Sequence, residues 1–313
     1  GDQEYRGGLR TTGQFFLNRL WTFGWDATLL SDRTFTRDYN VLYESTDVAV
    51  SQVHLTGLSQ TNYFDMRGYY FRVLTNDQGA EYNQARQPFV APVVDQNYLF
   101  DKDVLGGQLT MKNNVVSLTR DQTDCVDSGG DGICRPGDAI LGLKGNFNRA
   151  STDWTWQSQT IGPAGMVLKP FAYLRADAFY LSQDEQLLGI DDNGQYYRGM
   201  PAMGLEWRWP ILAAGGASSV LIEPIAQMIV RPDEPLAGRL PNEDAQSLVF
   251  DDSSLFDWDK FSGYDRIEGG TRANVGFRYA AELGAIATVS GVVGQSYQIA
   301  GLNSFAVEDL TET

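Results

Sequence analysis

The sequence predicts an all-β fold of long antiparallel strands. Segments of about ten to sixteen residues with alternating apolar and polar side chains recur along the whole chain. Tight gaps follow the odd segments, at 17–19, 58–61, 101–103, 162–164, 214–216 and near 284. Long polar gaps follow the even segments, at 32–45, 76–85, 121–138, 182–199 and 232–268. Antiparallel neighbours joined in this way place every tight turn on one side and every long loop on the other. This is the layout of a transmembrane β-barrel with long extracellular loops.

The pattern divides into about twelve strands, with boundaries that the alternation defines to within a few residues. They are 5–16, 20–31, 46–57, 62–75, 86–100, 104–120, 139–161, 165–181, 200–213, 217–231, 270–283 and 286–299. Neither a long helix nor an internal repeat beyond the hairpin is expected.

The alternation is clearest in 20–30, 166–178, 203–209 and 220–230. Because successive side chains of a strand point to opposite faces, each of these segments has an apolar and a polar face. In a barrel the apolar face meets lipid, and it includes Trp25, Leu174, Leu205 and Met228. The polar face then lines the lumen, with candidate residues Asp26, Arg67, Lys169, Arg175, Asp177, Glu206, Arg208 and Glu223.

A soluble β-sandwich would show the same alternation, with the apolar face as its core. Three features favour the membrane barrel. The segments are longer than the five or six residues that are about the average for globular strands. The loop lengths alternate strictly. Aromatic residues lie near strand ends, where a membrane-interface girdle belongs; these are Trp21, Tyr63, Tyr98 and Trp209.

Two prolines, Pro170 and Pro224, lie inside strand patterns on the apolar face. Proline cannot donate to the ladder of a sheet. A bulge or local break is therefore expected at each, with a simple adjustment of strand twist as the favoured alternative.

Composition restricts the function. The 313 residues carry 24 Lys and Arg against 40 Asp and Glu, a net charge of −16. This acidity argues against a nucleic-acid partner, which needs cations to meet its phosphates. No run of 18 apolar residues predicts a transmembrane helix. His54 is the only histidine, in a strand pattern without a nucleophile motif, so neither an enzyme nor a cofactor is expected.

A Gly- and Asp-rich loop holds both cysteines, Cys125 and Cys134. In an exported protein this spacing predicts a local disulfide that rigidifies an exposed loop. Four acids of the same stretch offer oxygen ligands to calcium; these are Asp124, Asp127, Asp131 and Asp138. Their spacing does not match the EF-hand pattern, so a stapled polar loop without metal is the preferred interpretation.

The last long loop, 232–268, combines acids with large apolar groups. An exposed loop needs few such groups, so we expect it to fold back onto the barrel mouth or lumen and bury them. The apolar side chains are Leu255, Phe256, Phe261 and Tyr264. Asp265 and Arg266 carry opposite charges beside the turn and are expected to bond strand ends or loop backbone.

The residues of this loop resemble the LptD family of outer-membrane lipopolysaccharide (LPS) assembly proteins, in its alphaproteobacterial form. The family-like residues of the loop are Asn242, Glu243, Asp244, Asp251, Asp252, Leu255, Phe256, Gly263, Tyr264, Asp265, Arg266, Gly269 and Gly270. Colinear stretches elsewhere are similar to the same family, at 30–39, 55–58, 63–71, 104–107, 222–227 and 294–298.

The resemblance implies a barrel of about 26 strands that exports LPS laterally into the outer leaflet. It also implies a lipoprotein plug of the LptE type in the lumen and a periplasmic LPS-transport bridge that docks on an N-terminal jelly roll. Residues 1–313 are then expected to be a single internal segment of the barrel, without the jelly roll and without the first and last strands. The family's cysteines between jelly roll and barrel have no counterpart in Cys125 and Cys134.

The ends of the chain agree with that expectation. It opens inside a strand pattern, without a signal peptide, and stops in a polar stretch after Phe305. A mature protein that starts at Gly1 is the alternative. Two other functions stay open: a general porin or uptake channel, and a soluble β-rich binding protein.

Overall fold

A computed structural model describes residues 5–41, 47–74, 80–125, 140–183, 193–216, 218–244, 254–284 and 287–306. It is all-β within these ranges, with a 14-stranded antiparallel sheet and a separate two-stranded sheet. The strands are β1 (Gly8–Phe16), β2 (Trp21–Leu30), β3 (Val48–Leu58), β4 (Asn62–Val73), β5 (Phe89–Leu99), β6 (Gln108–Arg120), β7 (Asp124–Cys125), β8 (Ile140–Gly142), β9 (Gly145–Gln157), β10 (Thr160–Ile161), β11 (Val167–Gln183), β12 (Asn193–Arg208), β13 (Ile211–Gly215), β14 (Ser218–Val230), β15 (Thr271–Leu283) and β16 (Ala287–Ala300). The helices are short: α1 (Phe35–Tyr39), α2 (Ala80–Arg86) and the 3-10 turns η1 (Pro163–Gly165) and η2 (Ser304–Ala306).

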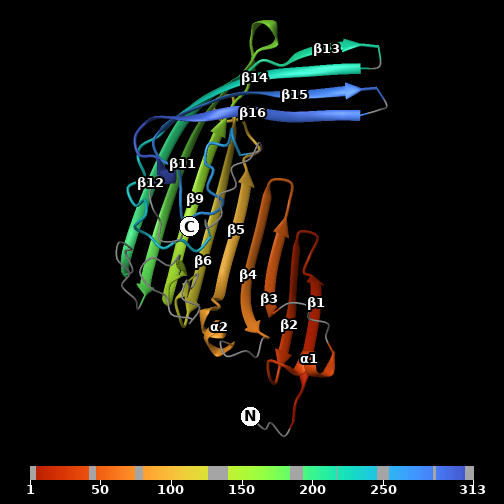
Figure 1. The fold of residues 1–313 in the computed structure, drawn as a ribbon, viewed down its shortest axis with the longest axis vertical. Coiled ribbons are helices and arrows are strands. Elements are labelled where there is room, and N and C mark those ends of the chain that lie inside the picture. The colour runs from red at the N-terminus through yellow and green to blue at the C-terminus, as the bar shows by residue number, and fades with distance from the viewer. Residues whose placement is uncertain are drawn as a thin grey trace.

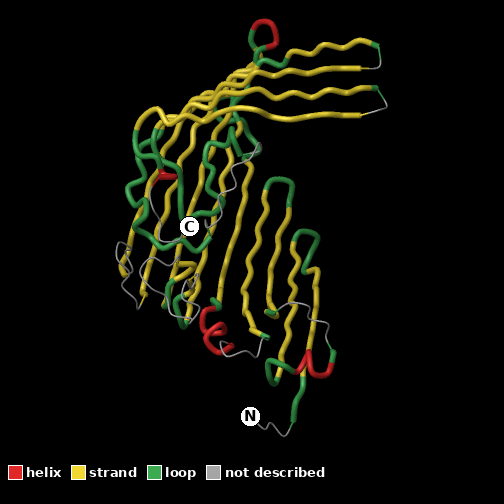
Figure 2. The backbone as a smooth tube through the Cα atoms, viewed as in Figure 1, coloured by secondary structure: helices red, strands yellow, loops and turns green. Residues whose placement is uncertain are grey.

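The twelve long strands pair in chain order, from β1 at one end of the path to β16 at the other. Tight turns join β1 to β2 and β3 to β4 at one end of the sheet, whereas α1 and α2 lie at the opposite end (Figure 2). Both the twelve-strand prediction and the alternation of connections are confirmed. Figure 1 shows the strands as a twisted, curled wall in which β13–β16 cross the direction of β1–β5 steeply. No helix in the described ranges is long and apolar enough to cross a membrane.

Two predicted strands differ from the structure. The expected strand 139–161 is divided into β8, β9 and β10, because β8 leaves the main sheet to pair with β7. The expected strand 200–213 instead begins at Asn193 and ends at Arg208. Its early start follows from pairing, since Asn193 lies opposite Ser182 of the long strand β11.

Each of the two prolines lies where a neighbouring strand is interrupted. Pro170 is opposite the gap between β9 and β10, and its carbonyl accepts from the Ser158 N–H at 3.1 Å. Pro224 is opposite the gap between β12 and β13, and its carbonyl accepts from the Trp209 N–H at 3.1 Å. Strands β11 and β14, which contain the prolines, stay continuous. The break lies in the neighbouring strand, which would have needed the N–H group that proline lacks as a hydrogen-bond donor.

The two faces of the sheet differ in chemistry and burial. The apolar face is exposed: Leu174, Leu205 and Met228 are 49%, 47% and 49% accessible. We call the opposite side the polar face; it carries Arg149, Arg175 and Arg198, which are all buried. The predicted girdle aromatics lie at the tight-turn end, but Tyr63 is on the polar face with Asp65.

What buries the polar face is the β14–β15 loop, residues 231–270, described at 231–244 and 254–270. It lies across β9 and β11 (Figure 1) and packs on apolar side chains that the sheet turns inward. One cluster joins Leu240 to Leu118, Phe147, Phe179 and Leu181. A second joins Ile267 to Tyr173, Met200, Ala202 and Ile229. The expectation that this loop folds back onto the sheet is confirmed.

Candidate functional site

Three charged residues form the centre of the polar face. Strand register places Asp177 of β11 directly opposite Arg198 of β12, and Arg175 two residues earlier on the same face. The two Asp177 carboxylate oxygens accept from Arg175 Nε at 2.9 Å and Arg198 Nε at 2.7 Å. Both arginines are almost fully buried, so each depends on this carboxylate and on the loop above it to compensate its charge.

Strand β9 extends this charged row. Asp153, directly opposite Arg175, accepts from the Tyr173 hydroxyl at 2.7 Å. Arg149, four residues earlier on the same face, donates to Asn114 Oδ1 of β6 at 2.7 Å. A continuous row of buried polar groups therefore crosses β6, β9, β11 and β12.

The loop closes over the row with its main chain. Arg198 donates to the carbonyl oxygens of Tyr264 and Asp265, each at 2.8 Å, and bonds the carboxylate of Glu234. Arg175 also donates to the Tyr264 carbonyl. The loop carbonyl groups are buried away from water, and the strand arginines supply the hydrogen bonds that water would otherwise provide. This explains how irregular backbone is tolerated there.

The family-like acids clamp the two ends of the loop together. Asp244 accepts the N–H groups of Tyr264 and Asp265 at 3.0 Å and Arg149 Nη2 at 2.8 Å. In the opposite direction, the Asp265 carboxylate accepts hydrogen bonds from the N–H groups of Glu243 at 2.6 Å and Asp244 at 3.0 Å. It also forms an ion pair with Arg149. The 241–244 and 261–270 stretches are thus one interlocked unit.

Further charges fix this unit to the wall. Arg120 at the end of β6 forms a bidentate ion pair with Glu243, with both N···O distances 2.8 Å. Glu268 pairs with Arg231, and its second oxygen accepts the Lys260 N–H at 3.0 Å. Arg266 donates to the Ser304 carbonyl at 2.7 Å, as expected of a charge that bonds loop backbone.

The glycines of the motif permit close approach. A Cβ at Gly263 would lie 2.4 Å from Asp244 Oδ1, and one at Gly269 would lie 2.6 Å from the Glu234 nitrogen. Gly270 has φ +74°, a conformation that other residues rarely adopt. The glycines therefore belong to the clamp rather than to a flexible hinge.

Aromatic rings fill the space between loop and sheet. The Tyr264 ring lies under the guanidinium groups of Arg175 at 4.8 Å and Arg149 at 5.4 Å. The Trp258 ring packs on Tyr173 of β11 with centroids 3.6 Å apart. Leu255 and Phe261 are buried, while Phe256 and Tyr264 are half-buried.

Burial changes the titration of two loop acids. It raises the pKa of Asp259 to about 7, assisted by the nearby charge of Glu268. It also raises the pKa of Asp265 to about 7, although Arg149 opposes the shift. The partner Asp244 keeps a lowered pKa, because the charge and hydrogen bond of Arg149 outweigh the effect of its burial.

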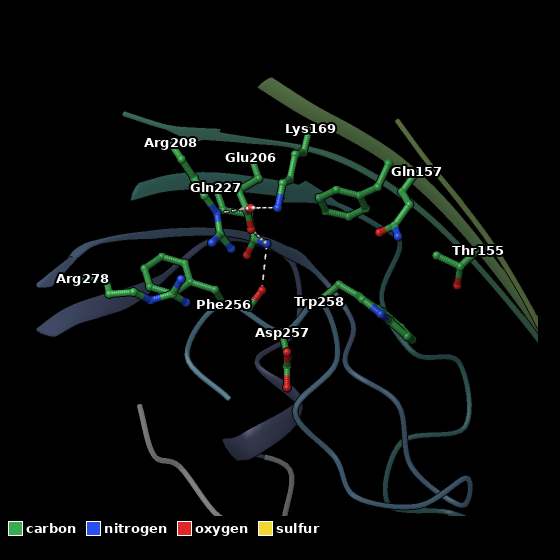
Figure 3. Close-up of a pocket in the computed structure, with 11 residues that line it drawn as sticks. Thr155, Gln157, Lys169, Glu206, Arg208, Gln227, Phe256, Asp257, Trp258 and Arg278 are labelled. Carbon is green, nitrogen blue, oxygen red and sulfur yellow. Dashed lines mark hydrogen bonds and ion pairs between the residues drawn. The ribbon is translucent and has the colours of Figure 1, made fainter. Parts of the chain in front are cut away.

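A pocket of about 510 Å³ lies between loop residues 256–258 and strands β11, β12, β14 and β15 (Figure 3). Its cations are Lys169, Arg208 and Arg278, and its rings are Phe171, Phe256 and Trp258. Glu206 lies between Lys169 and Arg208, at 3.8 Å and 2.5 Å, and accepts from Gln227 at 3.2 Å. Glu223, beside the pocket, meets Arg278 at 3.4 Å and Arg208 at 3.9 Å.

The eight predicted polar-face residues therefore fall into three environments. Arg175 and Asp177 are sealed beneath the loop. Lys169, Glu206 and Arg208 line the pocket, with Glu223 beside it. Asp26 and Arg67 lie on β2 and β4 and form ion pairs with residues of the wall itself: Asp26 pairs with Arg10 at 3.3 Å, and Arg67 with Asp65 at 2.6 Å.

Some predicted residues fall outside the described ranges, namely Asp251, Asp252, Cys134, Asp127, Asp131 and Asp138. Cys125 is buried at the end of β7. Cys125 is disulfide-bonded, and its predicted partner Cys134 lies outside the described residues. Asn242 is buried in the clamp region. Within the described part of the chain, no group of three His, Cys, Asp or Glu is arranged to hold a metal ion.

Several residues of the site were missed from sequence. Arg149 and Asp153 follow the alternation of β9 and would have been found by extending it from Phe147. Arg198 was missed because 193–199 was assigned to a loop. Arg120 and Glu268 carry no periodic signal that relates them to a partner.

Together these features define a class of protein: the wall of an antiparallel β-barrel whose apolar face is exposed and whose polar face is closed by its own loop. The chain matches the family model LptD, LPS transport system D, over residues 4–313. The protein therefore belongs to the LptD family, an outer-membrane family of LPS transport components rather than enzymes. A comparison with curated proteins found no match.

Proposed function

We propose that this chain is part of the wall and lumen of an outer-membrane translocon that inserts LPS into the outer leaflet. The observation that carries the proposal is the contrast between the two faces in a member of the LptD family. The exposed apolar face, with Leu174 and Met228, suits contact with lipid. The polar face, with its buried arginines, suits the lumen side.

The partners follow from what the loop leaves open. On β2 to β4 the polar face carries Asp26, Thr56 and Arg67 in hydrogen-bonded pairs, and no contact of the described loop reaches them. This open part of the polar face is the proposed docking surface for an LptE-like lipoprotein plug. The periplasmic LPS-transport bridge would deliver LPS through an N-terminal domain outside this segment.

A general porin or uptake channel is the alternative. It requires a water-filled lumen along the wall. The β14–β15 loop instead packs on β6 to β15 and buries their charged row, which favours a plugged translocon over an open channel.

The test is site-specific photocrosslinking in the full-length protein in cells. Probes at Asp26 and Glu206 are expected to form adducts with LPS or a small lipoprotein. Control probes at Trp25 and Leu174, on the apolar face, are expected to form neither lipoprotein adducts nor adducts with the LPS sugar. A correctly assembled barrel without adducts from the first pair would favour the channel.

A further inference from the structure

A hollow of about 460 Å³ interrupts the apolar face of the wall where β3, β4 and β5 lie side by side. Its apolar lining includes Phe23, Val53, Leu55, Met66 and Ala91. Two polar residues also border it, His54 and Arg67, but strand alternation directs their side chains to the polar face. The hollow is therefore presented to the membrane rather than to the lumen.

The backbone of β5 explains why the apolar face is concave here. Two residues of β5, Ala91 and Pro92, lie opposite a single residue of each neighbour, Gly68 in β4 and Ser117 in β6. Such a bulge bends the strand, and proline is tolerated at a bulge although it cannot donate to the ladder. Gly68 contributes no side chain at the same place, so the surface stays open.

The position of the hollow along the strands identifies the leaflet that it faces. Val53 and Gly68 lie opposite each other near the middle of β3 and β4. From there the lining continues through the row Phe23, Leu55 and Met66, toward the tight-turn ends of these strands. Tight turns face the periplasm in such barrels. The hollow therefore opens into the periplasmic leaflet of the outer membrane, which consists of phospholipid.

The chemistry of the hollow suits a hydrocarbon chain better than a protein segment. Membrane-embedded protein segments associate largely through close packing of small residues and through hydrogen bonds between polar side chains. The side chains that line the hollow are apolar and mostly large, so they offer neither. Unfilled space deprives its lining of dispersion contacts, which a flexible methylene chain restores. The volume also lies in the range of about 300–1,000 Å³ that is typical of small-ligand sites.

We propose that this hollow binds one acyl chain of a phospholipid from the periplasmic leaflet. The proposal goes beyond the proposed function, because it concerns the lipid-facing side of the wall and not the passage of cargo. The chain packs on Phe23, Val53 and Met66 and covers the place where the pairing of β5 is irregular on both sides. The bound lipid thus completes the surface of the sheet at its bulge.

The experiment uses the full-length protein in vesicles of phosphatidylethanolamine and phosphatidylglycerol. A trace of the phosphatidylethanolamine carries a diazirine at the end of one acyl chain, and photoadducts are located by mass spectrometry of peptides. Met66 is compared with Met228, an exposed methionine elsewhere on the apolar face. The adduct yield at Met66 is expected to be about fivefold higher, which corresponds to about 1 kcal/mol. Equal yields at the two methionines would overturn the proposal.

The variant Gly68→Leu fills the hollow with a side chain of the protein itself. The φ of Gly68 is not in the left-handed region, and a Cβ there would make ordinary contact with Val53 Cγ1 at 3.4 Å. The excess of adducts at Met66 is expected to disappear in this variant. Gly199→Leu is the matched control, because Gly199 lies on the apolar face of β12 with nothing within 4 Å of its Cβ position. It is expected to keep the full excess.

A second filling variant, Ala91→Leu, approaches the hollow from β5 and serves if Gly68→Leu does not assemble. An unchanged excess at Met66 in either assembled variant would overturn the proposal. A photoreactive residue in place of Met66, irradiated in cells, tests the other occupants. A lipid adduct supports the acyl chain, whereas an adduct with a protein would assign the hollow to a partner protein or to a second copy of this chain.

Discussion

The two halves of the wall are made from the same strands but are stabilised differently. In β1–β5 the charged pairs of the polar face lie between adjacent strands or within one strand, such as Arg67 with Asp65. From β6 to β15 the central part of the polar face is buried under the loop, and single residues there, such as Asp177 and Arg149, have several partners. A lumen-side residue can thus belong to a surface or to a core, depending on one loop.

The difference between the two halves shows how a barrel wall can acquire a hydrophobic core. Strands of the covered half carry Phe147, Tyr173, Phe179 and Ile229 on the polar face, where they pack against the loop. Burying such side chains stabilises by about 1.5–3 kcal/mol each. The following predictions test the contrast, from the largest expected effect to the smallest.

Removal of one buried charge should separate the halves most strongly. Asp177→Asn leaves Arg175 and Arg198 without their shared carboxylate, at an expected cost of about 3–5 kcal/mol. Arg10→Gln removes one partner of a pair with Asp26 in which both side chains are exposed, by 40% and 33%, and should cost about 0–1 kcal/mol. Guanidinium unfolding of the full-length protein in detergent measures both. Similar losses would mean that the loop does not create a core.

The apolar face should not distinguish the halves. Leu174→Arg in β11 and Val53→Arg in β3 replace exposed apolar residues in mid-strand, and each should cost about 2–4 kcal/mol in a bilayer. Folding into lipid vesicles at graded denaturant gives the values, with Leu174→Ile as control. If either arginine were tolerated, the face assignment in that half would be wrong.

The clamp should be sensitive to a single methyl group. Gly263→Ala places a Cβ 2.4 Å from Asp244 Oδ1 and should destabilise the docked loop by about 1–3 kcal/mol. Gly199→Ala, in β12, meets nothing within 4 Å and should be neutral. Limited proteolysis of the loop reports the effect. Equal cleavage of both variants would contradict the interlocked geometry.

The smallest effect is a pH dependence confined to the covered half. Asp259, with a pKa raised to about 7, binds its proton more tightly in the folded loop than in an unfolded chain. Stability from this group is therefore present at low pH and is lost as pH rises toward 7, by about 1 kcal/mol between pH 6 and pH 8. Hydrogen exchange at the Phe261 and Glu268 amides, which donate to Asp259, measures it. Asp259→Asn should remove the share that Asp259 contributes and leave that of Asp265, whose pKa is also raised to about 7; an unchanged dependence would assign all of it to Asp265.

Sequence patterns predicted the strands well because each strand is long and its apolar and polar side chains alternate over most of its length, as in β11 and β14. They failed where pairing overrides the local pattern. Residues 193–199 contain two glycines and adjacent tyrosines, yet they are extended because β11 offers a partner. The division of 139–161 likewise depends on β7, which no local signal relates to β8.

The site was predictable only in part for the same reason. Lys169, Glu206 and Arg208 lie on one polar face by alternation alone, and the pocket gathers them. The clamp depends on contacts between distant segments, such as Arg149 with Asp244 and Arg120 with Glu243. The resemblance marked the loop residues, whereas only the fold gives their physical role.

The Arg120–Glu243 contact joins residues 123 positions apart. Closing so long a stretch of chain costs configurational entropy that only an already ordered sheet can offset. We therefore expect the loop to dock after β6, β9, β11 and β12 have paired. A wall with an unpaired or mispaired strand would then leave this acidic segment undocked, so docking of the loop depends on correct pairing of the strands beneath it.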